Sequence, residues 1–189
     1  HLIFAGSSAG SAGMGYNLDM VTEMLPQAKV LGIRDAAFSP NLNSDMGFTF
    51  DDELEKIGNA RVEYWNPVYD TTCFEQNSED PNPCLNFGYL YTNNYLETPF
   101  FVYMDQNDHM VMDRFPDPDN QLVKDAVAES IRKDLYDFPY GAFSTRTGNH
   151  VALTDDHKFF HVTVNGATYY ETLGNWIYQR PGEVKVIAE

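Results

Sequence analysis

A tight glycine-rich turn between an apolar run and a helical pattern is the feature that most restricts how this chain can fold. The chain starts HLIFAGSSAGSAGMG, so the apolar residues 2–5 lead directly into GSSAG at residues 6–10. A Gly-x-Ser-x-Gly turn between a strand and a helix is typical of a nucleophile elbow, which exposes the serine hydroxyl. We therefore predict that Ser8 is a nucleophile. A glycine-rich connection without any chemistry is the alternative, because so short a pattern also arises by chance.

The residues around Ser8 are the types that an elbow requires. Side chains two residues before and after the nucleophile would crowd the turn, which predicts that Gly6 and Gly10 are needed at those places. The same turn is expected to aim the amide of Ala9 at a developing oxyanion, at the positive end of the following helix.

Length and charge limit the classes of protein to which the chain can belong. Its 189 residues are enough for one domain with a real core. The 12 Lys and Arg residues face 28 Asp and Glu residues, and the net charge of -16 argues against nucleic acid or an anionic membrane as a partner. No stretch approaches the roughly 18 apolar residues of a membrane helix, so membrane insertion is not expected.

The two cysteines lie in a polar, loop-like segment, CFEQNSEDPNPC, that runs from Cys73 to Cys84. A short disulfide loop is the preferred interpretation, and it points to a secreted protein, extracellular or periplasmic. Two free thiols are the alternative, and the spacing fits no zinc pattern.

Strands and helices are predicted to alternate along the chain, as in an α/β fold with a mostly parallel sheet. The expected elements are helix 10–25, strand 30–33, strand 100–104, a helix that Asp119 or a neighbour caps, strand 159–164 with a turn at Asn165-Gly166, and a helix ending near Trp176. The apolar faces of the first two helices are expected to be Met14, Leu18, Val21 and Leu25, and Leu122, Ala126, Ile131 and Leu135.

Residues 36–96 interrupt this alternation and are interpreted as an inserted cap. The segment is rich in Asn, Asp, Pro and aromatic residues and contains one plausible acidic helix beginning near Asp51. Its aromatic side chains either line a substrate pocket or simply pack: Trp65, Tyr69, Phe87, Tyr89, Tyr91 and Tyr95.

A serine nucleophile needs a base and an acid, which follow an elbow serine in the order acid, then histidine. Asp105 and Asp108 come directly after the predicted strand 100–104, and His150 lies in a later polar loop. Asp35, at the end of an earlier strand, is interpreted as a residue that merely closes that strand. The weaker histidine candidates are His109, His157 and His161, of which the last two have the i, i+4 spacing of a helical metal site.

Four patches of the sequence together resemble one known family. LIFAGSSAGSAGMGYNLDMV resembles the elbow of the pectin acetylesterase and Notum carboxylesterase family, where GSSAGG leads into a helix bearing N-x-D. TPFFVYMDQND resembles its Pro-x-Phe-Val strand, with the acid nine residues after the proline, which selects Asp108 over Asp105. AFSTRTGNH resembles the loop ending in the catalytic histidine, and HVTVNGATYYETLGNW resembles its V-x-V-x-G segment and closing tryptophan.

The resemblance implies an α/β-hydrolase in which Ser8, Asp108 and His150 are nucleophile, acid and base, with Ala9 as one oxyanion donor. It implies a secreted serine carboxylesterase that needs no cofactor or metal and removes an acetyl or other short-chain acyl group from a polysaccharide or similar substrate. A non-catalytic extracellular structural or interaction protein with the same fold is the alternative.

Two differences from the family pattern and one gap stand out. Ser11 stands where the family usually has a second glycine, and Thr and Arg precede His150 where members often carry a cysteine. Family members also have several strands before the elbow. Residues 1–189 are therefore expected to be the C-terminal half of a single α/β-hydrolase domain, with an N-terminal chain or segment of the same precursor as its partner.

Overall fold

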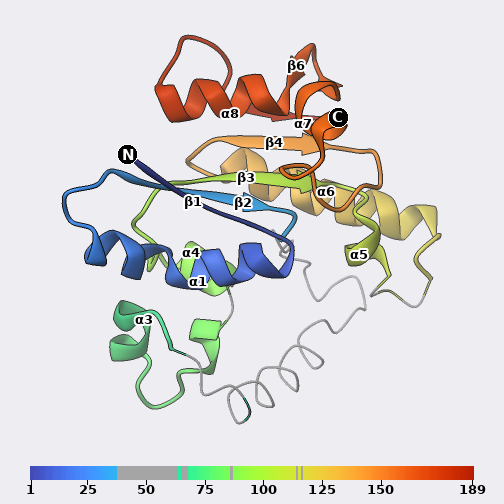
Figure 1. Ribbon diagram of the computed structural model, residues 1–189. Coiled ribbons are helices and arrows are strands. Elements are labelled where there is room, and N and C mark those ends of the chain that lie inside the picture. Colours follow the sequence, from blue (N-terminus) through green and yellow to red (C-terminus); the bar gives the residue numbers. More distant parts are fainter. Residues whose placement is uncertain (38–63, 65–67, 86, 114, 116) are drawn as a thin grey trace.

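A five-stranded parallel sheet forms the centre of the molecule (Figure 1). The computed structural model describes residues 1–37, 64, 68–85, 87–113, 115 and 117–189. The strands, in spatial order, are β1 (Leu2–Ser7), β2 (Val30–Asp35), β3 (Phe100–Asp105), β4 (Ala142–Thr145) and β7 (Lys185–Ile187). Every neighbouring pair runs parallel, which confirms the predicted α/β-hydrolase-like class of a mostly parallel sheet flanked by helices.

Helices cover both faces of this sheet. One face packs against α1 (Ala9–Met24), α4 (Phe87–Thr92) and α6 (Gln121–Asp137), and the opposite face packs against α8 (Tyr169–Tyr178). In Figure 1 the sheet lies between α8 above it and α1 and α4 below it. The shorter elements are α3 (Thr71–Gln76), η2 (Asn82–Leu85), α5 (His109–Met112), α7 (Asp156–Phe160), β5 (Thr163–Val164) and β6 (Ala167–Thr168).

Two apolar clusters form the core, one on each face of the sheet. The first contains Leu18 of α1, Phe100 of β3 and Ile131 of α6. The second contains aromatic rings, among them Phe143 of β4 and Tyr169 of α8, whose ring centroids lie 5.7 Å apart. All six residues of β2 and of β3 are buried, as expected for central strands of a parallel sheet covered on both sides.

The turn that contains Ser8 follows directly after β1. Among the described strands, β1 pairs with β2 alone. Its side chains alternate between more and less exposed positions, and Ile3 is 44 % exposed. Such a strand has one free hydrogen-bonding edge in the described part of the chain.

One buried helix face and some element boundaries predicted from the sequence were wrong. Leu122 is 80 % exposed because α6 buries a different stripe, Val123, Val127, Ala128, Ile131 and Leu135. Leu25 lies just after α1 and is exposed. Residues 156–160, the start of a predicted strand and its approach, form α7, where the Asp155 side chain caps the first turn.

Little of the predicted cap can be compared with the structure, because residues 38–63 and 65–67, with Trp65 and the acidic helix, lie outside the described residues. Within the described part, Phe87 and Tyr91 contact the Phe100 ring edge-on and belong to the core. Tyr89 stacks on Tyr95 and Tyr69 packs against Phe74. The predicted disulfide between Cys73 and Cys84 is present.

Candidate active site

Ser8 lies at a sharp turn between β1 and α1, as the sequence predicts. Its backbone angles, φ 54° and ψ -124°, are rare for a residue with a side chain. The amide of Ser8 donates to the Asp35 carbonyl at 2.8 Å, and the Ser8 carbonyl accepts the Ser11 amide at 2.9 Å. These contacts hold a strained serine at the carboxyl edge of the sheet, which is the geometry of a nucleophile elbow.

The two glycines of the turn are not equivalent. A Cβ atom on Gly6 would overlap the Gly10 carbonyl and lie 2.7 Å from the Ser11 nitrogen, both of them backbone atoms. A Cβ atom on Gly10 would meet no described atom within 4 Å. The expected crowding is present at Gly6, whereas at Gly10, in the first turn of α1, the described residues supply none.

Asp108 is fully buried and uses its two carboxylate oxygens differently. Oδ1 accepts the Met110 amide at 2.9 Å and so caps α5, while Oδ2 lies 2.7 Å from Nδ1 of His150. The cap fixes the side-chain rotamer, so that the second oxygen is held toward the imidazole.

His150 lies between Asp108 and Ser8. It is in the loop after β4, its Nε2 is 2.6 Å from Oγ of Ser8, and its side chain is 20 % exposed. In the tautomer whose Nδ1–H donates to Asp108, Nε2 is free to accept the hydroxyl proton of Ser8. The structure therefore brings together the three residues that the sequence places 100 and 42 positions apart.

Asp105, the rejected candidate for the acid, has another set of contacts. It is fully buried, and its carboxylate accepts the Thr145 and Thr147 hydroxyls at 2.6 and 2.7 Å and the Asn107, Thr147 and Gly148 amides at 2.8–3.0 Å. These donors come from the loop that carries Asp108, from Thr145 at the end of β4 and from the loop after β4 that carries His150. Asp105 thus joins the two loops and has no oxygen left for the imidazole.

Asp35 contacts the segments that carry Ser8 and His150, a role that the sequence interpretation missed. It is fully buried at the end of β2, and its side chain accepts hydrogen bonds from Ser7, Ala152 and Leu153. Burial raises the pKa of its carboxyl, although these hydrogen bonds and the nearby His150 act in the opposite direction. The signal that could have identified it is its place at the carboxyl end of a strand beside the elbow, where open parallel sheets collect site residues.

Three further residues of the elbow and its helix, Ala9, Ser11 and Asp19, differ in their hydrogen bonding. Ala9 is the first residue of α1, and a first-turn amide has no carbonyl of its own helix to bond, as an oxyanion donor requires. Ser11 is fully buried, and its hydroxyl has no partner among the described residues. In the N-x-D segment, Asp19 accepts the amides of Glu97 and Thr98, both at 2.9 Å, which ties α1 to the segment before β3.

The other histidines lie outside the Ser8–His150–Asp108 arrangement. His109 packs its ring against that of His150, with centroids 5.9 Å apart, and its Nδ1 is 3.2 Å from the Gly148 carbonyl. His157 and His161 lie on and just after α7, and no group of three possible metal ligands occurs in the described part of the chain. No helix among the described residues is long and apolar enough to cross a membrane.

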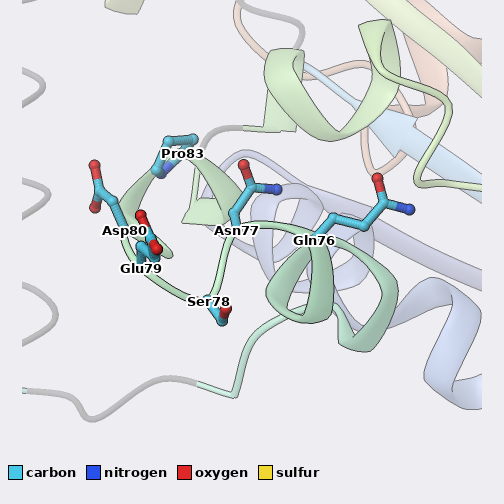
Figure 2. Close-up of a pocket in the computed structure, with 6 residues that line it drawn as sticks. All are labelled: Gln76, Asn77, Ser78, Glu79, Asp80 and Pro83. Carbon is cyan, nitrogen blue, oxygen red and sulfur yellow. The ribbon is translucent and has the colours of Figure 1, made fainter.

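A hollow of about 450 Å³ lies apart from these residues, inside the disulfide loop (Figure 2). It is lined by Gln76, Asn77, Ser78, Glu79, Asp80 and Pro83. Polar loop residues surround it, and none of the side chains expected to do chemistry reaches it.

Comparison with solved structures identifies the fold. Two crystal structures of the Wnt deacylase Notum from Drosophila match all of this chain, with TM-scores of 0.75 and 0.77. The chain has the fold of the matched part of Notum. The sequences are 18 % and 19 % identical over the match, and this chain spans 56 % and 55 % of the Notum chains. No family model and no curated protein matches the sequence.

Proposed function

We propose that this chain is the nucleophile-bearing part of a secreted serine carboxylesterase. The single observation that carries the proposal is the position of His150, 2.6 Å from the Ser8 hydroxyl on one side and 2.7 Å from the Asp108 carboxylate on the other. Ser8 is also in the strained conformation that an elbow nucleophile needs.

The proposed reaction proceeds in two halves. His150 takes the proton of Ser8 as Oγ attacks the ester carbonyl, and then gives that proton to the leaving alcohol. Water, deprotonated by His150, next attacks the acyl-enzyme and releases the acid with Ser8 restored. Asp108 holds the imidazole and stabilises its protonated form, and the Ala9 amide is one donor to the oxyanion.

The proposed substrate is an acetyl or other short-chain acyl ester of a polysaccharide or similar molecule. Support comes from the sequence resemblance and from the fold shared with a deacylase. The net charge of -16 disfavours a strongly anionic polymer as substrate. The disulfide between Cys73 and Cys84 supports an oxidising location, which includes secretion.

We also infer that a segment or chain of the same precursor pairs with β1. The outer edge of β1 is unpaired among the described strands, and this chain spans about half of the Notum chains that share its fold. Intact mass and N-terminal sequencing of the native material test this inference: a second polypeptide or a longer chain supports it, and a native chain beginning at His1 that purifies alone contradicts it.

A fluorophosphonate probe, with the labelled peptide located by mass spectrometry, tests the enzymatic proposal. We expect label at Ser8, abolished by His150→Ala and retained by the matched control His157→Ala, whose ring is exposed on α7. Turnover of p-nitrophenyl acetate against longer acyl esters, and release of acetate from acetylated polysaccharides, then define the acyl group and the alcohol. A folded protein that is not labelled supports the alternative, a non-catalytic protein that keeps the fold.

A further inference from the structure

Asp35 is a buried carboxylate for which the proposed mechanism has no use. It ends β2 in parallel register with Ser7 of β1, so it is adjacent to the residue that precedes the nucleophile. Its side chain is fully buried. Carboxylates are costly to bury unless a positive charge or several donors compensate them, so its contacts indicate what it does.

Three hydrogen bonds connect Asp35 to both sides of the reacting pair. Oδ2 accepts the Ser7 hydroxyl at 2.6 Å and the Leu153 amide at 3.2 Å, and Oδ1 accepts the Ala152 amide at 3.1 Å. The backbone carbonyl of Asp35 accepts the amide of Ser8 itself at 2.8 Å. One residue therefore holds the turn before the nucleophile and the segment that directly follows His150.

The charge of Asp35 also acts on His150. Among the described residues, His150 is the cationic group found to act on Asp35, and its charge opposes the rise in the pKa of Asp35 that burial causes. The other titratable groups that interact with Asp35 are the hydroxyls of Tyr103 on β3 and Tyr169 on α8, which are neutral at ordinary pH. The charge of the carboxylate is therefore best balanced when the imidazole is protonated.

A neutral side chain would avoid the cost of burying a charge but could make only part of the same turn. Asn could donate to the Ser7 hydroxyl and accept one of the two amides, but its NH2 group would then face the other amide, so the hydrogen bonds as well as the charge favour a carboxylate here. What only the charge supplies is attraction to a protonated imidazole, the form that exists during each chemical step of the proposed reaction.

We propose that Asp35 is a positioning residue that holds Ser8 and His150 in register and favours, through its buried charge, the protonated imidazole formed during each step. The inference rests on the proposed esterase function. Asp108 remains the hydrogen-bonded acid, and Asp35 acts on the same ring from the β2 side without touching the reacting atoms.

The test compares Asp35→Asn with two control variants, using fluorophosphonate labelling and p-nitrophenyl acetate hydrolysis. We expect Asp35→Asn to fold and to lower kcat about tenfold with little change in KM. Ser7→Ala keeps the charge, so it is expected to slow labelling about threefold. Asp156→Asn, an exposed charge removed from α7, is expected to change neither.

Each outcome decides between the alternatives. A folded Asp35→Asn protein with wild-type kcat overturns the inference while leaving the proposed function intact. An unlabelled wild-type protein overturns the proposed function, and the inference with it. Should Asp35→Asn fail to fold, Ser7→Ala decides: labelling at the wild-type rate means that the contact to Asp35 does not position the nucleophile.

Discussion

Replacing Gly6 and Gly10 by alanine, one at a time, separates the crowded side of the nucleophile turn from its open side. The added methyl group is the same in both variants and lies two residues from Ser8 in each. At Gly6 it would overlap the Gly10 carbonyl and lie 2.7 Å from the Ser11 nitrogen, whereas at Gly10 nothing described lies within 4 Å.

The magnitude follows from these distances. Cβ atoms essentially never approach another heavy atom closer than 3.0 Å, so the Ser11 nitrogen must retreat by at least 0.3 Å and the Gly10 carbonyl by more. Both are backbone atoms of the first turn of α1, which cannot rotate away as a side chain can. We expect Gly6→Ala to destabilise the fold by about 3 kcal/mol. Gly10→Ala is expected to be neutral or to stabilise by about 0.5 kcal/mol, because alanine suits a helix better than glycine.

The same displacement separates Ser8 from His150, whose reacting atoms are 2.6 Å apart. A misplacement approaching 1 Å costs about a hundredfold in rate, so Gly6→Ala is expected to react with a fluorophosphonate about a hundredfold more slowly, while Gly10→Ala keeps the wild-type rate. Urea unfolding gives the stability difference and a labelling time course gives the reactivity. Equal losses of stability in the two variants, or a Gly6→Ala protein as stable as wild type, would refute the reasoning from the Cβ contacts.

Three further outcomes are expected. Asp105→Asn places an amide among N–H donors, so it is expected to lower the free energy of unfolding by about 3 kcal/mol, measured in urea; an unchanged midpoint would show that the two loops are held by other contacts. Replacing Cys73 and Cys84 by serine opens a loop of sequence separation 11 and is expected to cost about 3 kcal/mol in the same assay; a cost near zero would mean that the loop is equally restricted without the bond. The capping contacts of α8 lower the pKa of Glu171 below 4.5, so their contribution is present above that pH and is lost as the pH falls; Glu171→Gln should therefore show a shallower loss of stability in acid, and parallel curves would contradict this sign.

The sequence was sufficient to predict the elements that local pattern determines. The sequence correctly predicted strands at the apolar runs of β2 and β3 and a turn at Asn165-Gly166. A buried strand or a tight turn requires particular residue types at neighbouring positions, which makes it visible in the sequence. The register of the α6 stripe was misjudged, because Leu122 and Val123 are both apolar and only the packing of the helix decides which of them faces the sheet.

Hydrogen bonds between distant segments could not be predicted in this way. Asp105 ends β3 and Asp108 comes three residues later, so the two look alike in sequence. What distinguishes them is which groups of the loop after β4 contact each of them. The side chain of Asp35 contacts Ser7 and Ala152, which are 28 and 117 positions away in the sequence. The sequence pattern around Asp35 therefore indicated only the end of a strand. Spacing and resemblance pointed to Ser8 and Asp108, the two residues that contact His150. The roles of Asp35 and Asp105, which hold the surrounding segments, could be recognised only from the structure.

The stacked, buried rings of Tyr103 and Tyr169 have a consequence for absorbance spectroscopy. Burial, together with the charges of Asp105, Asp35 and Asp108, raises the pKa of Tyr103 far above its usual value, and burial with the charge of Asp35 does the same for Tyr169. In an alkaline absorbance titration these two phenols should stay silent while exposed tyrosines ionise. Their ionisation should come only when the protein unfolds, as a single late step in the tyrosinate signal. That step would report, without any substrate or probe, whether the buried carboxylates are still assembled around the sheet edge.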